Sequence, residues 1–188
     1  MWNTFTDLEQ AKRSICTGYG ARSIPFTHVP FLETMLRVED YSCMLDFGCG
    51  IGRNLKYLVT AGQGQGAQII GYDFPNMITL AKEYLGEELW NKIIWVNPPL
   101  NNLNGYSFNL IIATIVFQHI PREYLRDVLK FLSEHLEEGG VLFVYSRGYL
   151  DQGGNIWPHL LEHFEPVTVL DPTKGDETHQ AVIFKEKQ

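Results

Sequence analysis

Met44-Leu45-Asp46-Phe47-Gly48-Cys49-Gly50-Ile51-Gly52-Arg53-Asn54-Leu55 is the stretch on which the fold of this chain depends. Its first residues have the apolar character of a buried strand, and Leu55, Leu58 and Val59 follow at helical spacing. The three alternate glycines between these two patterns predict a tight turn. Glycine tolerates positive φ and, because it lacks Cβ, lets the backbone approach a ligand closely. The stretch therefore predicts a strand, a turn that meets a small molecule, and a helix.

The spacing of these glycines argues against two common nucleotide motifs. In the dinucleotide fingerprint G-x-G-x-x-G the third glycine would stand where this chain has Arg53. The phosphate-loop pattern also fails, because no Gly-Lys-Ser/Thr follows. Instead the stretch, with Asp46 two residues before the first glycine, resembles the first motif of class I S-adenosylmethionine-dependent methyltransferases. The resemblance implies S-adenosylmethionine as cofactor, with Asp46, Gly48 and Gly50 at its methionine part.

Strand and helix patterns alternate along the rest of the chain. Strands are expected at 68–73, 93–96, 108–114 and 141–146, and a helix over 124–136 that Gly139-Gly140 ends. A hairpin is expected from 167–170 and 180–184. The resemblance extends over about residues 43 to 185 and implies an α/β fold. This is a Rossmann-like three-layer sandwich whose mostly parallel seven-stranded sheet is closed by a C-terminal antiparallel hairpin.

Length and composition exclude several classes of protein. A chain of 188 residues suits one domain with a single core. Fifteen Lys and Arg against 22 Asp and Glu argue against a nucleic-acid partner, which normally requires clustered positive charge. The three cysteines have no metal or disulfide spacing, and no apolar run is long enough to span a bilayer. We expect a cytoplasmic protein without a metal, acting as a monomer or homodimer on a small-molecule acceptor.

Residues 1–40 are expected to form an N-terminal helical lid on a cofactor-binding core of residues 41–188. Leu8, Ala11 and Ile15 lie at helical spacing, and a second helix is expected near Met35. The resemblance implies that such a leader folds over the cofactor, which makes Tyr19 a candidate catalytic residue and makes Arg22 and His28 candidates for the lid. The alternative is that the leader simply packs on the sheet.

Asp73 comes at the end of the second expected strand. A carboxylate there can accept hydrogen bonds from both hydroxyls of a ribose. The resemblance implies this role, and implies that Phe74 and Met77 of the following Asp-x-x-x-Met continuation flank the adenine. Asp73 is alternatively a cap for a helix that begins at Pro75.

Asn97-Pro98-Pro99-Leu100 follows the third expected strand. It resembles the Asn/Asp-Pro-Pro-aromatic motif of amino-group methyltransferases that act on nucleic acids and proteins. Leu100 replaces the aromatic residue, and the motif belongs after the fourth strand. We therefore expect Asn97 to lie beside the adenine, with an N-methyltransferase of this kind as the alternative.

The segment Phe108 to Pro121 is close to the family's Phe-Asp-Leu-Val strand and its Glu-His-Ile-Pro ending. Ligands of open α/β sheets bind beyond the carboxyl ends of the strands, so residues from Thr114 to His119 should meet the cofactor and its substrate. His119 could take a proton from an attacking hydroxyl or amine, or could be a structural residue of the turn. Arg147 follows the fifth strand and faces the same crevice, where it binds an anionic group or pairs with a surface acid.

These patterns together predict transfer of the methyl group of S-adenosylmethionine to an O or N atom of a small molecule. A second alternative is a cofactor-binding protein without catalysis, because Asn109 and Gln118 stand where the family usually has carboxylates.

Overall fold

Strand β1 (Cys43–Phe47) is buried at every position and lies in the interior of the sheet, between β2 and β4. The computed structural model describes residues 5–16, 32, 36, 41–60, 66–170 and 180–187. In this part of the chain one sheet has the strand order β3-β2-β1-β4-β5-β7-β6. The remaining strands are β2 (Gln68–Tyr72), β3 (Ile94–Val96), β4 (Phe108–Thr114), β5 (Leu136–Ser146), β6 (Phe164–Leu170) and β7 (Gln180–Glu186).

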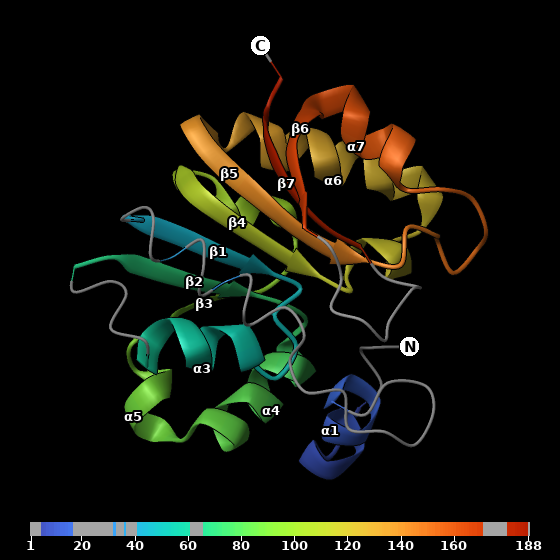
Figure 1. Cartoon of the computed structure of the whole chain (residues 1–188). Coiled ribbons are helices and arrows are strands. Elements are labelled where there is room, and N and C mark those ends of the chain that lie inside the picture. Colours follow the sequence, from blue (N-terminus) through green and yellow to red (C-terminus); the bar gives the residue numbers. More distant parts are fainter. Residues whose placement is uncertain are drawn as a thin grey trace.

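The sheet is parallel from β3 to β5 and ends in two antiparallel pairs, β5 with β7 and β7 with β6. Figure 1 shows helices on both of its faces. One layer contains α3 (Arg53–Thr60), α4 (Pro75–Leu85) and α5 (Glu87–Trp90), and the other contains α6 (Arg122–Glu134) and α7 (Trp157–His163). Short 3₁₀ helices η2 (Leu100–Leu103) and η3 (Phe117–His119) follow β3 and β4. The three-layer fold with its closing hairpin is confirmed.

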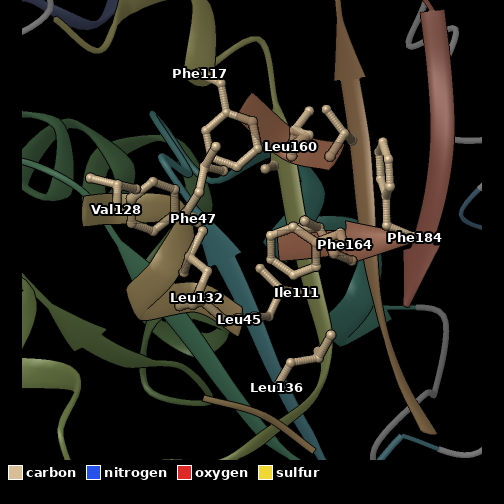
Figure 2. Packing of buried hydrophobic residues seen from close by; sticks show 14 of the residues in the cluster. Leu45, Phe47, Ile111, Phe117, Val128, Leu132, Leu136, Leu160, Phe164 and Phe184 are labelled. Carbon is tan, nitrogen blue, oxygen red and sulfur yellow. The ribbon is translucent and has the colours of Figure 1, made fainter. Parts of the chain in front are cut away.

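Alternate residues of the central strands supply two separate cores, because successive side chains of a strand point to opposite faces. Leu45, Phe47 and Ile111 pack toward α6 and α7, together with Phe164 and Phe184, as Figure 2 shows. Met44, Leu110 and Ile112 belong to the second cluster, which includes Leu55 and Leu58 of α3. A parallel sheet covered on both faces explains why these strands are continuous apolar runs in the sequence.

The predicted boundary between the helix over 124–136 and the strand at 141–146 was wrong. Helix α6 ends at Glu134, and Leu136 already pairs with Phe108 as the first residue of β5. The register of β4 with β5 shifts after this pair, and Gly139 and Gly140 lie inside the irregularity. A Cβ on Gly140 would lie 2.9 Å from the Glu137 carbonyl oxygen. The two glycines therefore accommodate a bulge in a strand and do not end the helix.

Helix α1 (Leu8–Cys16) confirms the first helix expected in the leader. Leu8 and Ala11 pack against Ile51, Met77 and Leu80. Leu32 and Leu36 are helical and buried in the second core, whereas the rest of the second expected helix lies outside the described residues. The division into a lid and a core within one domain stays a prediction. No helix that the model describes is long and apolar enough to cross a membrane.

Candidate active site

The glycine turn between β1 and α3 is held by the carboxyl end of β2. The backbone N–H groups of Gly48 and Cys49 donate to the Tyr72 carbonyl at 2.8 and 3.2 Å. The Gly50 N–H donates to Asp73 Oδ2 at 2.7 Å, and the Phe74 N–H donates to Asp73 Oδ1 at the same distance. The structure thus brings Gly48, Gly50 and Asp73 together, as the sequence predicts. It also shows that Asp73 shapes the turn itself.

Asp46 is a completely buried carboxylate beneath this turn. Its Oδ1 accepts a hydrogen bond from Asn54 Nδ2 at 3.2 Å, and the same amide donates to Thr114 Oγ1 at 3.0 Å. Asp46 Oδ2 is buried and has no hydrogen-bond partner among the described residues. Burial raises the pKa of Asp46 to about 7, against the opposing effect of the Asn54 hydrogen bond. An unsatisfied buried acceptor of this kind suits a cationic or N–H-bearing ligand group.

The raised pKa of Asp46 makes stability depend on pH. The folded protein binds the Asp46 proton more tightly than the unfolded chain, so this contribution is present below about pH 4 and is lost as pH rises through about 7. We expect Asp46→Asn to lose less unfolding free energy than the wild type between about pH 5 and about pH 8. Urea titrations at both pH values measure this loss of unfolding free energy. The exposed α6 variant Asp127→Asn is the control for removal of one negative charge. Equal losses in wild type and Asp46→Asn would contradict this assignment.

Gly48 is the position where the turn has no room for a side chain. It has φ +72°, and a Cβ built on it would lie 2.3 Å from Val116 Cγ2. Val116 reaches this place because Ile115 has φ 57°, an unusual value for a β-branched residue, at the end of β4. The carboxyl ends of β1 and β4 therefore approach each other closely only with glycine at position 48.

Replacing Gly48 by alanine should cost about 2–5 kcal/mol of unfolding free energy. About 1–2 kcal/mol comes from the left-handed backbone and about 1–3 kcal/mol from the collision with Val116. Gly86 is the matched control, since it has φ +74° and no atom within 4 Å of a built Cβ. Chemical denaturation of Gly86→Ala should show only the backbone cost, and Val116→Ala should partly rescue Gly48→Ala. Equal costs at the two glycines would refute the packing argument.

The residues expected near the adenine lie beside Asp73. The Asp73 N–H donates to the Val96 carbonyl at 3.3 Å, which places Asn97 next to the end of β2. Asn97 is exposed, and Phe74 is 44% exposed although it is a large apolar residue. Met77 has no exposed surface and packs with residues of α1. Contact of these three residues with the adenine stays a prediction.

His119 is the centre of a polar cluster beyond the ends of β4 and β5. Its Nδ1 lies 2.5 Å from Asp151 Oδ2, and Asp151 Oδ1 pairs with the guanidinium of Arg147. Burial lowers the pKa of His119, while the hydrogen bond and charge of Asp151 oppose that change. The structure thus joins His119 and Arg147 through one carboxylate. Tyr19, Arg22 and His28 lie outside the described residues.

Two residues of these clusters, Asp151 and Asn54, were not predicted from the sequence. Asp151 follows β5 by five residues and belongs to no motif, so only the folded loop shows that it reaches His119. Asn54 is a buried polar residue in the first turn of α3. The sequence signal that could have identified Asn54 is its position directly after the glycine motif, on a helix whose apolar face begins with Leu55.

Asn109 does not belong to the site. Its Oδ1 accepts a hydrogen bond from the Cys43 N–H at 3.1 Å, and its Nδ2 donates to Ser42 Oγ at 3.0 Å. These contacts join the amino ends of β1 and β4, at the edge of the sheet opposite to His119. The amide at this position therefore joins two strands and lies away from the candidate site.

The arrangement fits an S-adenosyl ligand. The buried Asp46 Oδ2 offers an acceptor to an ammonium group. Asp73 can accept ribose hydroxyls through the lone pairs that its two backbone contacts leave. In the described part of the chain no group of three or more His, Cys, Asp or Glu is placed to hold a metal ion.

Comparison with known protein families supports this interpretation of the site. A family model described as a methyltransferase domain matches residues 45–142, which are slightly more than half of the chain. The chain belongs to the class I S-adenosylmethionine-dependent methyltransferases. The matched range runs from β1 into β5, so it contains the glycine turn, Asp73 and His119 of this methyltransferase. The resemblance seen in the sequence is confirmed.

Individual relatives show the same kinship. The chain is 29% identical over 107 residues to the probable S-adenosyl-L-methionine-dependent methyltransferase TehB of Haemophilus influenzae, and the match covers 52% of this chain and 33% of TehB. It is 30% identical over 115 residues to the carboxy-S-adenosyl-L-methionine synthase of Chromohalobacter salexigens, covering 60% and 43% of the two chains. It thus spans a third to less than a half of the length of these curated relatives.

A solved methyltransferase structure resembles this chain in fold. N-methyltransferase NodS from Bradyrhizobium japonicum, in complex with S-adenosyl-L-homocysteine, has a TM-score of 0.74 and 19% sequence identity, covering 99% of this chain and 100% of NodS. At this level of identity the likeness demonstrates a shared fold. The likeness covers a larger share of the chain than the family match does.

Proposed function

We propose that this protein transfers the methyl group of S-adenosylmethionine to an O or N atom of a small-molecule acceptor. One observation carries the proposal: the glycine turn with Asp46 and Asp73 lies at the same edge of the sheet as the His119–Asp151 pair. Ligands of such sheets bind beyond the carboxyl ends of the strands. In this proposal the bound cofactor and a proton acceptor therefore lie beyond the same edge of the sheet.

Each residue of the pocket has a distinct role in this proposal. Asp46 and the backbone at Gly48 and Gly50 bind the methionine part, and Asp73 binds the ribose. Asn97 and the exposed face of Phe74 bind the adenine. Met77 supports this side from the core, and Thr114 holds the Asn54 amide that orients Asp46. When bound, S-adenosylmethionine supplies a methyl group already activated by its sulfonium, so the reaction depends mainly on alignment of the acceptor.

The polar cluster around His119 faces the acceptor. A neutral imidazole can take the proton that a hydroxyl or amine loses as it is methylated. Asp151 holds the ring through Nδ1, and Arg147 balances the charge of Asp151. Tyr19 remains a candidate for the acceptor side of the site.

The two alternatives have less support. The Asn97-Pro98 segment follows β3 next to the proposed adenine position, whereas His119 follows β4, where an acceptor group would be expected. The alternative of a cofactor-binding protein without catalysis rests on the amides at positions 109 and 118. Asn109 lies at the opposite edge of the sheet, so it gives this alternative no support. The net charge of −7 also favours a small molecule over a nucleic acid.

Isothermal titration calorimetry with S-adenosylhomocysteine tests the cofactor assignment. We expect one site per chain, and the absence of both heat and a thermal shift with intact protein would refute the proposal. A screen of hydroxyl-bearing and amine-bearing small molecules with methyl-labelled cofactor then identifies the acceptor. Transfer to nucleic acid or protein in the same screen would favour the alternative instead. We further propose a cytoplasmic location, with which the buried thiols of Cys43 and Cys49 agree, and a monomer or homodimer.

A further inference from the structure

Gln118 is a polar side chain that is only 4% exposed, in η3 directly after β4. Its Oε1 lies 3.4 Å from Ser146 Oγ and 3.5 Å from the Arg147 backbone nitrogen. Its own backbone carbonyl accepts a hydrogen bond from the Asp151 N–H at 2.8 Å. Gln118 therefore connects the end of β4 to the loop after β5, which carries the partner of His119.

Two donors determine which way the Gln118 amide points. A backbone N–H can only donate, so the atom that faces the Arg147 nitrogen must be the amide oxygen. Ser146 Oγ accepts from the Gly148 N–H at 3.5 Å, which directs the Ser146 proton to the same oxygen. The amide nitrogen of Gln118 then faces His119 Nε2 at 3.4 Å.

His119 is consequently constrained at both ring nitrogens. Asp151 as a carboxylate only accepts, so the proton between Oδ2 and Nδ1 belongs to Nδ1. The amide nitrogen of Gln118 only donates, so Nε2 presents its lone pair. Both contacts select the same neutral tautomer. The Gln118 contact, at 3.4 Å, is long for a hydrogen bond, so Asp151 is the main determinant of this tautomer and Gln118 supports it, while the Nε2 lone pair remains able to take a proton.

The charge of the side chain at position 118 also affects the protonation state of His119. A carboxylate at this distance from Nε2 would favour the imidazolium, which cannot accept a proton. Among the described residues, the charged groups that face His119 are Asp151 and Arg147, which have opposite signs. A neutral amide beside Nε2 therefore leaves the balance between these two charges undisturbed.

We propose that Gln118 is a positioning residue that keeps His119 neutral, with Nε2 as proton acceptor for a hydroxyl or amine that loses its proton on methylation. This inference rests on the proposed function, and it narrows the acceptor to groups of that class. The acceptor atom forms its bond to the methyl carbon as the bond between that carbon and the sulfonium sulfur breaks, and the electron pair of the broken bond stays on the sulfur of the product S-adenosylhomocysteine. The proton of the acceptor atom passes to Nε2. Gln118 acts through His119 and needs no contact with the substrate.

Two-bond ¹H–¹⁵N NMR spectra of the full chain test this inference without cofactor or acceptor. His119→Asn identifies the His119 signals. In the wild type we expect a dominant tautomer with the proton on Nδ1. In Gln118→Glu we expect the pKa of His119 to rise by about one to three units, the range for an opposite charge at close distance. The pH at which methyl transfer begins should rise by the same amount, because the base must be unprotonated.

Gln118→Met is the matched control, because it has similar length and neither charge nor hydrogen bond. It should leave the pKa of His119 below that of Gln118→Glu and weaken the tautomer preference. A wild-type tautomer with the proton on Nε2, or an unchanged pKa in a folded Gln118→Glu, would overturn the inference. If Gln118→Glu does not fold, the wild-type tautomer and the tautomer preference of Gln118→Met still test the inference. If the same variants bind S-adenosylhomocysteine, failure of the inference about Gln118 leaves the proposed function intact.

Discussion

Replacing His119 by asparagine is expected to lower the rate constant of methyl transfer by about 10²–10⁴-fold, the usual contribution of a general base. Asparagine keeps a polar side chain in the turn and removes the basic nitrogen. The Asp151–Arg147 ion pair does not depend on the imidazole. The affinity for S-adenosylhomocysteine should therefore stay at the wild-type value, so that the loss appears in kcat. Steady-state kinetics with the acceptor from the screen, together with calorimetry, measures both quantities.

His159→Asn is the matched control for this experiment. His159 lies on α7, where its nearest acidic partner is Glu162 at 4.0 Å, and it has no contact with the polar cluster in the described part of the structure. It should keep wild-type kinetics. If His119→Asn also transfers methyl groups at the wild-type rate, His119 is a structural residue of the turn before Pro121. That outcome would leave the cofactor assignment intact.

Replacing Asp73 by alanine is expected to weaken binding of S-adenosylhomocysteine by about 10- to 150-fold, equivalent to about 1.5–3 kcal/mol for hydrogen bonds to a charged group. Two causes act together. The ribose hydroxyls lose their acceptor, and the Gly50 and Phe74 N–H groups lose the carboxylate that holds the turn. Calorimetry at constant ionic strength gives the ratio of dissociation constants.

Asp73→Asn separates these two causes. The asparagine oxygen can still accept one backbone N–H, but its amide group cannot accept from a second. Its affinity should lie between those of the wild type and the alanine variant. An unchanged affinity in Asp73→Ala would remove Asp73 from the cofactor site and leave it as a residue of the turn. Thermal unfolding of each variant shows whether the fold itself is intact.

Much of the fold could be predicted because local patterns and the global fold agree. The parallel strands are covered on both faces, so they are apolar at every position, and the helices repeat their apolar residues at helical spacing. The boundary at Leu136 failed because an apolar residue at helical spacing also suits the start of a strand. The glycines that suggested the end of a helix accommodate a bulge in β5.

The identity of the cofactor was determined by the sequence alone. The positions of Asp46, Gly48, Gly50 and Asp73 depend on two neighbouring strands and the turn between a strand and its helix, and such local constraints leave a pattern in the chain. The likeness of the glycine stretch to a known motif was therefore sufficient to name the cofactor.

The contacts of the proposed acceptor side were decided only by the tertiary structure. His119 and Asp151 are 32 residues apart, and the loops after β4 and β5 bring them together in a contact that no local pattern encodes. The same is true of Gln118, which the sequence presented as the loss of a carboxylate. Folding places its amide between Arg147 and the His119 ring, where a neutral donor selects the tautomer of a base. Side-chain chemistry at such contacts depends on long-range packing, so it is absent from the sequence pattern.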